Sequence, residues 1–257
     1  MEKTVEGLVR LGYAAKALVY ILVGSLALKV AAGVEGGRIT DQGGALYVVL
    51  GQPFGRALVL LAAIGLLTYA AWEILGAILG WRRQAGEGYG ARALTVIRAL
   101  VYAAIGVQGM RLAIGLRGTH AGPEPLVRAA LAWPFGEWLI VMVGLGVGYY
   151  GIIEIIDAIK GKLEPDLDAA TLRRRAGEWA LYVARGGIGA RGILLAILGF
   201  SVIRAALDHR PSAAGGMDSS MLILNTLPQG TLLLGAAAAG VLAYGIYQLL
   251  HARYAHV

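Results

Sequence analysis

The stretch Lys16-Ala-Leu-Val-Tyr20-Ile-Leu-Val-Gly24 decides the fold, because the chain contains it three times. The second copy is Arg98-Ala-Leu-Val-Tyr102-Ala-Ala-Ile-Gly106, and the third is Arg191-Gly-Ile-Leu-Leu195-Ala-Ile-Leu-Gly199. A second motif follows each copy and reads Pro-x-Gly, then Gly, Tyr and Glu or Gln at fixed distances. Its copies are Pro53/Gly55/Gly65/Tyr69/Glu73, Pro134/Gly136/Gly146/Tyr150/Glu154 and Pro228/Gly230/Gly240/Tyr244/Gln248. Self-similarity at a regular spacing indicates an internal repeat, so the sequence predicts one structural unit used three times.

The composition favours a membrane protein. Of the 257 residues, 58% are hydrophobic and only 15% are charged, against about 25% charged in a typical soluble domain. Apolar stretches of roughly 20 residues are long enough to cross a bilayer as helices. Six occur, at residues 11–32, 57–79, 94–116, 138–159, 188–207 and 231–250. The sequence therefore predicts an all-α integral membrane protein with six transmembrane helices.

The first apolar stretch could also be a cleaved signal peptide. A charged start is followed by an apolar run and then by the small residues Val30-Ala31-Ala32. Signal peptides have the same three regions in the same order. The same window recurs at Arg98 and Arg191, far from any N-terminal cleavage site. This recurrence favours a first span that the protein retains.

The repeats divide the chain into four predicted segments. Residues 1–83 form repeat one, 84–163 repeat two, 164–187 a linker and 188–257 repeat three. Each repeat has an even number of spans, so successive repeats should point the same way, around a pseudo-threefold axis along the membrane normal. We expect the linker to be an amphipathic helix that ends at Gly186-Gly187. Its basic residues Arg173, Arg174 and Arg175 and its Trp179 are typical of a helix lying among anionic lipid headgroups, the alternative being a solvated connector.

The distribution of Lys and Arg predicts the topology. Twelve lie at the termini and in the two linkers between repeats: Lys3, Arg10, Arg82, Arg83, Arg92, Lys160, Lys162, Arg173, Arg174, Arg175, Arg185 and Arg253. Five lie in the opposite loops: Arg38, Arg56, Arg117, Arg128 and Arg210. Cytoplasmic loops carry the excess of bases, so both termini are expected in the cytoplasm. Because the bases are spread over loops, the net charge of +7 does not indicate nucleic-acid binding.

Ionisable residues inside the predicted spans are the candidate site. Two neighbouring helices of one repeat would be antiparallel, which predicts the pairs Lys16–Glu73 and Arg98–Glu154, with Arg191–Gln248 as a neutralised third pair. A charge at this depth is costly alone, so pairing is expected. The pairs either hold each hairpin together or form a polar solute site around the central axis; the absence of a shared reactive group favours the structural role.

The repeated aromatic residues share the helix face of these polar groups. Spacings of four residues place Gly65, Tyr69 and Glu73 on one face, as they do Lys16, Tyr20 and Gly24. The repeat-face tyrosines are Tyr20, Tyr69, Tyr102, Tyr150 and Tyr244. Small residues let helices approach closely in membranes, which favours packing over a cofactor-binding stripe. No cofactor is predicted.

Signals for an enzyme or a metal site are weak. The histidines His120, His209, His251 and His256 are assigned to loops and the tail, so no helical histidine is expected for haem. His120 with Glu124, or Asp208 with His209, offers too few ligands for a metal prediction. The sequence lacks a Gly-x-Ser-x-Gly elbow, a Walker loop and His-Glu-x-x-His. We predict neither an enzyme nor a metal protein.

The repeat pattern resembles the bacterial membrane family called domain of unknown function 1206. Pro53-Phe54-Gly55 and Pro134-Phe135-Gly136 fit the pattern, whereas the third repeat departs from it with Pro228-Gln229-Gly230, Leu195 and Gln248. The resemblance covers residues 10–248 and implies a six-span protein of the bacterial cytoplasmic membrane. It implies no activity.

Three functions are open at this point. The first is a non-catalytic scaffold or accessory subunit that contacts the lipid bilayer and either another membrane protein or further copies of itself. The second is a channel or transporter for ions or small solutes, with its polar site on the pseudo-threefold axis. The third is an enzyme that acts on lipid, and only the basic residues Arg173 to Arg175 support it.

Overall fold

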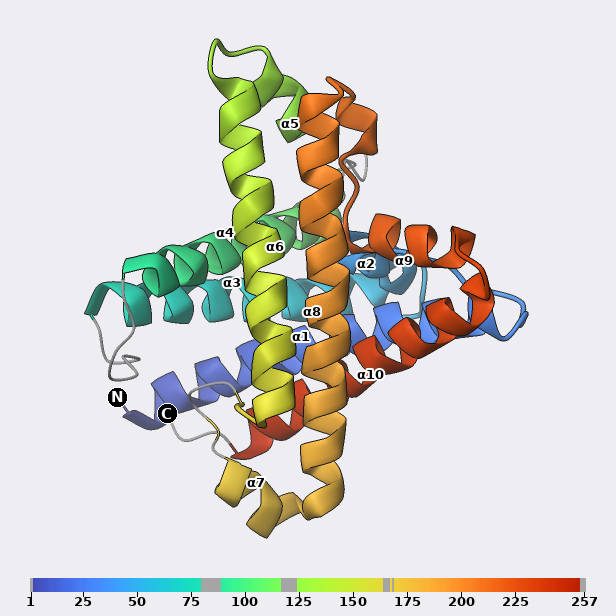
Figure 1. Ribbon diagram of the computed structural model, residues 1–257. Helices are drawn as coiled ribbons and strands as arrows, with labels where there is room; N and C mark the ends of the chain where they lie inside the picture. Colours follow the sequence, from blue (N-terminus) through green and yellow to red (C-terminus); the bar gives the residue numbers. More distant parts are fainter. Residues whose placement is uncertain (1, 80–88, 117–123, 164–166, 168, 255–257) are drawn as a thin grey trace.

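The computed structural model describes residues 2–79, 89–116, 124–163, 167 and 169–254, and it contains helices and no strands in these ranges (Figure 1). The elements are α1 (Glu2–Ala31), α2 (Gln42–Leu50), α3 (Gly55–Leu79), α4 (Tyr89–Ala113), α5 (Glu124–Leu131), α6 (Gly136–Lys160), α7 (Ala169–Ala176), α8 (Glu178–Leu207), the 3₁₀ turn η1 (Pro211–Ala213), α9 (Met217–Thr226) and α10 (Gly230–Tyr254). The all-α prediction is confirmed. The boundary predicted between residues 83 and 84 lies outside the described residues.

Five of these helices, α1, α3, α6, α8 and α10, are long and apolar enough to cross a membrane. The shortest of them have 25 residues. At about 1.5 Å per residue such a helix is about 38 Å long, which exceeds the ~30 Å hydrocarbon core and leaves room for tilt. These helices indicate a multi-pass membrane protein. The predicted span 94–116 corresponds to α4, which also has 25 residues but is not among the five.

The long helices pack mainly between repeats. The most extensive contacts join α6 to α8, α1 to α10 and α3 to α4. Each of these pairs combines the second helix of one repeat with the first helix of the next, and α10 closes the series on α1. Within repeats, α1 also packs on α3, and α8 on α10, but less extensively. The tightest hairpins are therefore the ones that join consecutive repeats.

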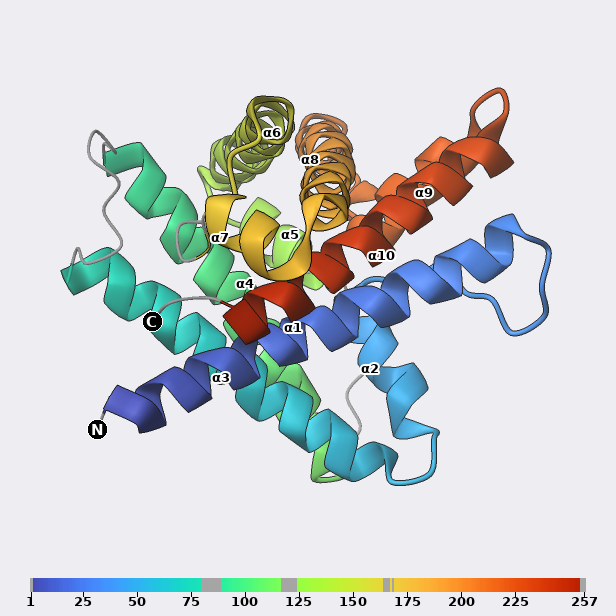
Figure 2. The same cartoon turned by 90° about the horizontal axis from the view of Figure 1, so that it is seen from below.

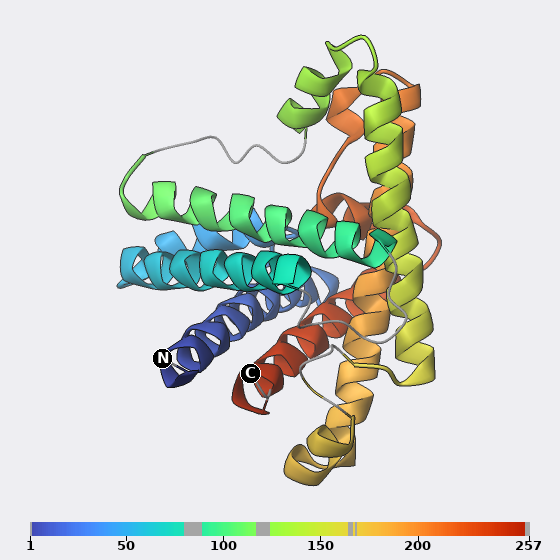
Figure 3. The ribbon, with the colours of Figure 1, turned by 90° about the vertical axis from the view of Figure 1, so that its left-hand side faces the viewer.

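The three helix pairs run in different directions and cross near the middle of the molecule. The α6–α8 pair stands steeply across the other two in Figures 1 and 3, and is seen nearly end-on in Figure 2. Helices α1 and α10 lie side by side and run in opposite directions (Figures 1 and 2). The long helices thus form three crossed pairs that share a centre (Figures 1 and 3).

A short helix precedes every Pro-x-Gly motif: α2, α5 and α9 end just before Gly55, Gly136 and Gly230, respectively. A Cβ atom added to these glycines would lie 2.2 Å from the Val49 carbonyl oxygen, 1.7 Å from that of Ala130 and 2.0 Å from that of Asn225. No side chain fits at such distances. The repeated glycine therefore allows each long second helix to start directly against the short helix before it.

The single linker helix predicted over 164–187 is wrong. The structure has the short α7, then Gly177 with a φ of +95°, and then α8 from Glu178 onward. Gly186 and Gly187 lie inside α8 and make no turn. Because the residues after Gly177 continue directly into the apolar run, span five extends ten residues further toward the N-terminus than its predicted start at 188.

Candidate functional site

The structure brings the predicted intramembrane polar residues together in the centre of the helix assembly. Lys16, Glu73 and Gln248 are completely buried, and Glu154 and Arg191 are nearly so. With Arg98 they are called the polar cluster below. Its members come from all six long helices, so the cluster connects the three repeats.

The ion pairs of the cluster join consecutive repeats. Arg98 of α4 pairs with Glu73 of α3, and Arg191 of α8 pairs with Glu154 of α6. Each arginine thus lies against a carboxylate of the preceding repeat, whereas the predicted partners were Glu154 for Arg98 and Gln248 for Arg191; the predicted pairs, with Lys16–Glu73, stay predictions. The reason for the observed pairing is the packing of α3 on α4 and of α6 on α8, which places each carboxylate against the base of the following repeat.

Tyrosine supplies the connection within each repeat. Lys16 Nζ donates to the Tyr69 hydroxyl at 3.2 Å. Arg98 Nη1 donates to the Tyr150 hydroxyl at 3.0 Å. In the third repeat the Arg191 guanidinium carbon lies 4.9 Å from the centre of the Tyr244 ring. Arg98 and Arg191 therefore each bind a tyrosine of their own repeat and a carboxylate of the preceding one.

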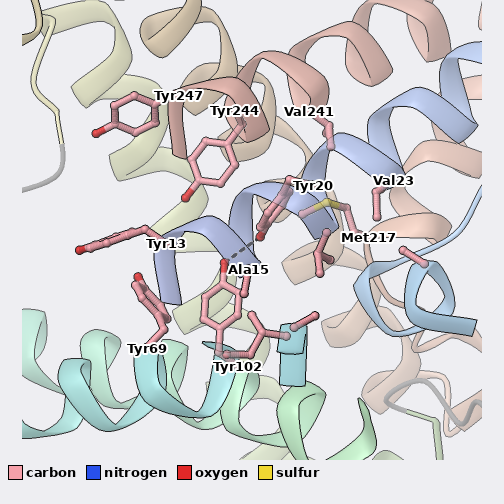
Figure 4. Close-up of a cluster of buried hydrophobic side chains, with 14 of the residues drawn as sticks. Tyr13, Ala15, Tyr20, Val23, Tyr69, Tyr102, Met217, Val241, Tyr244 and Tyr247 are labelled. Carbon is pink, nitrogen blue, oxygen red and sulfur yellow. Dashed lines mark hydrogen bonds between the residues drawn. The ribbon is translucent and has the colours of Figure 1, made fainter. Parts of the chain in front are cut away.

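Aromatic rings surround the Lys16 ammonium. Its Nζ lies 4.7 Å from the ring centre of Tyr69 and 5.3 Å from those of Tyr102 and Tyr244. Figure 4 shows these rings converging from α3, α4 and α10. Ring faces attract cations, and the attraction is stronger where water is excluded, as it is around this buried lysine.

Hydrogen bonds through Tyr20 link the cluster to the short helix α2. The Tyr20 hydroxyl lies 2.9 Å from that of Tyr102, as Figure 4 shows, and accepts a bond from Arg191 Nε at 3.2 Å. Gln42 of α2 donates to the same oxygen at 3.3 Å. All five predicted repeat-face tyrosines thus contact a base of the cluster.

Sequence reasoning missed an aromatic layer beside the cluster. The Tyr13 ring stacks on His251 with ring centres 4.1 Å apart, and Tyr247 lies 5.7 Å from the same histidine. His251 was assigned to the tail, but it is buried in the last turn of α10. The layer is not repeated, since Thr95 and Ile188 occupy the positions equivalent to Tyr13. A comparison of the three repeats in the sequence therefore could not predict this layer.

The predicted interfacial bases lie in α7 and are exposed. Arg173 pairs with Glu178 across the break at Gly177, and Arg174 lies 3.4 Å from the Thr171 hydroxyl. At the other end of the molecule His209 Nε2 lies 3.6 Å from Glu137, and Asp208 accepts from Arg204. His120 and His256 lie outside the described residues. Within the described ranges no three His, Cys, Asp or Glu residues come together as a metal site.

The polar cluster combines charges of both signs, most of them buried: three bases, two carboxylates and one neutral amide. Each of the two arginines faces a carboxylate, and the lysine faces aromatic rings and a hydroxyl. Burying a charge is costly unless a partner and hydrogen bonds compensate, and these contacts supply both. The arrangement can hold six helices in one register.

Comparisons with known proteins agree with the repeat pattern. A family model described as Domain of Unknown Function (DUF1206) matches the chain three times, over residues 11–80, 94–161 and 186–255. The uncharacterized protein YxxB of Bacillus subtilis (strain 168) is 30% identical over 253 residues, which cover 96% of this chain and 90% of that protein. No solved structure matches.

Proposed function

Because the chain belongs to the DUF1206 family, whose description assigns no activity, we propose from its own geometry that it is a non-catalytic scaffold or accessory subunit of a membrane assembly. The observation that carries the proposal is the closed polar cluster. Its two arginines are paired with carboxylates, its lysine lies among tyrosine rings, and all its members except the partly exposed Arg98 are buried. Such a cluster holds the helices in fixed positions. A rigid arrangement of helices suits a protein that offers a constant surface to its partners, as a scaffold does.

The proposed setting is the bacterial cytoplasmic membrane, crossed six times, with α4 as the sixth span. The cyclic pairing of α3 with α4, α6 with α8 and α10 with α1 supports three equivalent repeats around a pseudo-threefold axis. The excess of basic residues at the termini and linkers supports cytoplasmic ends. The three arginines of α7, with the exposed Trp179 at the start of α8, support a contact with anionic headgroups.

The second candidate is a channel or transporter with its polar site at the same centre. The observation in its favour is the connected set of hydrogen bonds from Gln42 through Tyr20 to Arg191 and Tyr102. Conduction would require water to pass Lys16, which is completely buried. For this reason the scaffold is preferred.

Two experiments on the purified protein separate the candidates. In vesicles loaded with an ion-sensitive dye, we expect the reconstituted protein to give no flux above that of empty vesicles. Ion flux through the unmodified protein that disappears in the Lys16→Ala variant would instead establish the channel or transporter. After solubilisation of native membranes in a mild detergent, we expect a second protein to elute with this one in fixed ratio. A protein that elutes alone and monodisperse would contradict the accessory role.

A further inference from the structure

The contact between α4 and α6 is built differently from its two counterparts. Within repeats one and three, α3 packs on α1 and α10 on α8 through a glycine. A Cβ atom added at Gly65 would lie 2.5 Å from the Cβ of Ala15, and one at Gly240 would lie 2.1 Å from that of Ala190. A Cβ atom added at Gly146, the equivalent position of α6, would have no atom of the described side chains or backbone within 4 Å. The facing sides of α4 and α6 are called the seam below.

The sequence accounts for this wider spacing. A Cβ on Gly12 would lie 2.9 Å from that of Tyr69, and one on Gly187 would lie 2.4 Å from the Tyr244 backbone nitrogen. The equivalent residue of repeat two is Leu94. Likewise, Ile97 occupies the position of Ala15 and Ala190. Leucine and isoleucine are larger than the glycine and alanine that let helices approach closely in membranes.

Side chains along the seam are correspondingly exposed. Val101 is 53% exposed, whereas its counterparts Val19 and Leu194 are 1% and 0% exposed. The Arg98 side chain is 16% exposed, against 5% for Arg191. On the α6 side, Val143 is exposed where Ala62 of α3 is buried. The seam therefore combines apolar walls with one accessible base of the polar cluster.

One carboxylate oxygen of Glu154, a residue on the helix face that also carries Gly146 and Tyr150, has no hydrogen-bond donor in the described part of the chain. Gly146, Tyr150 and Glu154 follow one another at four-residue spacing on one face of α6, and the Tyr150 hydroxyl reaches Arg98 of α4. Glu154 Oε1 pairs with Arg191. Its Oε2 is buried and makes no hydrogen bond within the described part of the chain. Buried polar atoms are almost always hydrogen-bonded, so this oxygen indicates a donor that the chain itself does not supply.

We propose that the seam binds a membrane lipid whose headgroup donates a hydrogen bond to Glu154 Oε2 and whose acyl chain packs against Val101 and Val143. The ligand must be apolar along its length and carry an N–H or O–H group at one end. In a bilayer, phospholipids with an ethanolamine or glycerol headgroup combine these properties. A choline headgroup has no N–H or O–H to donate, so it is the matched negative probe.

The test is native mass spectrometry of the delipidated full-length protein titrated with phosphatidylethanolamine, phosphatidylglycerol or phosphatidylcholine of identical acyl chains. We expect the first two to be retained about tenfold more strongly than the third, as one hydrogen bond to a charged group predicts. Val101→Trp should fill the seam and abolish the difference. Leu100→Trp is the control, since Leu100 is similarly exposed on a neighbouring face of α4.

Equal retention of all three lipids would overturn the proposal, as would unchanged lipid binding by Val101→Trp. A dimer that Val101→Trp dissociates would show that a second copy occupies the seam, and would overturn it too. Glu154→Gln adds an independent check if it folds, because an amide is a weaker acceptor than a carboxylate. It should reduce ethanolamine binding and leave choline binding unchanged.

Discussion

The bases at the start of the three repeats occupy equivalent positions but are held in two ways. Arg98 and Arg191 each pair with a carboxylate of the preceding repeat, Glu73 and Glu154. Lys16 lies among three tyrosine rings, and the residue equivalent to those carboxylates is the neutral Gln248.

The comparison of the three repeats shows that the type of base and the side chains around it differ together. The planar guanidinium offers several donors and matches a carboxylate, whereas a compact ammonium suits the faces of aromatic rings. Where the acid is replaced by an amide, the base is lysine. The three repeats therefore share one packing scheme but differ in the side chains that surround the base.

Removing a carboxylate should have the largest effect. Glu154→Ala leaves the buried Arg191 without its ion pair, which is expected to cost about 3–5 kcal/mol of unfolding free energy. Equilibrium unfolding in detergent measures the loss. Glu124→Ala, which removes an exposed pair with Arg128, should cost no more than about 0.5 kcal/mol. Similar losses in both variants would show that the buried pair is unimportant.

Converting the lysine environment into an arginine environment should have the next largest effect. Lys16→Arg places a bulkier cation in a completely buried position, and such overpacking is expected to cost about 1–3 kcal/mol. Adding Gln248→Glu places a carboxylate at the position equivalent to Glu73 and Glu154, so the double variant should recover part of the loss. A double variant that is less stable than Lys16→Arg would contradict the proposed equivalence of the three positions.

A smaller effect is expected at the tyrosine that joins both environments. Tyr102→Phe removes the hydrogen bond to Tyr20 but keeps the ring beside Lys16, for an expected cost of about 0.5–1.5 kcal/mol. Tyr102→Leu also removes the ring and should cost more. The same unfolding assay compares the two variants, and equal costs would argue against a contribution of the ring to holding the lysine.

The smallest effect belongs to the exposed arginines of α7. Arg173→Ala removes a surface pair with Glu178, worth at most about 1 kcal/mol. Binding to vesicles that contain anionic lipid should weaken when Arg173, Arg174 and Arg175 are all replaced by alanine, while the unfolding free energy hardly changes. Unchanged vesicle binding would remove the support for an interfacial α7.

Much of the fold could be predicted from periodicity. The recurrence of the Lys16 motif, together with the apolar stretches, placed the long helices and the polar residues between them. The pairing partners could not be read from spacing, because an acid at the end of one helix is equally close in depth to the base of its own repeat and to that of the next.

Features that occur once escaped prediction for a related reason. His251 and Tyr13 stack in a layer that has no copy in the other repeats. The seam has a sequence difference, Leu94 and Ile97 in place of glycine and alanine, but this difference alone did not predict a change in helix packing. The structure supplies the contrast, because Gly65 and Gly240 lie in close helix contacts and Gly146 has no such contact with the described residues.

A pair of double-mutant cycles tests the central claim, that each arginine of the cluster is bound to the carboxylate of the preceding repeat. One cycle combines Glu73→Gln with Arg98→Met, and the other combines Glu154→Gln with Arg98→Met. Direct contact predicts a coupling of about 1–3 kcal/mol in the first cycle, and a clearly smaller one in the second. A larger coupling between Arg98 and Glu154 than between Arg98 and Glu73 would contradict the account.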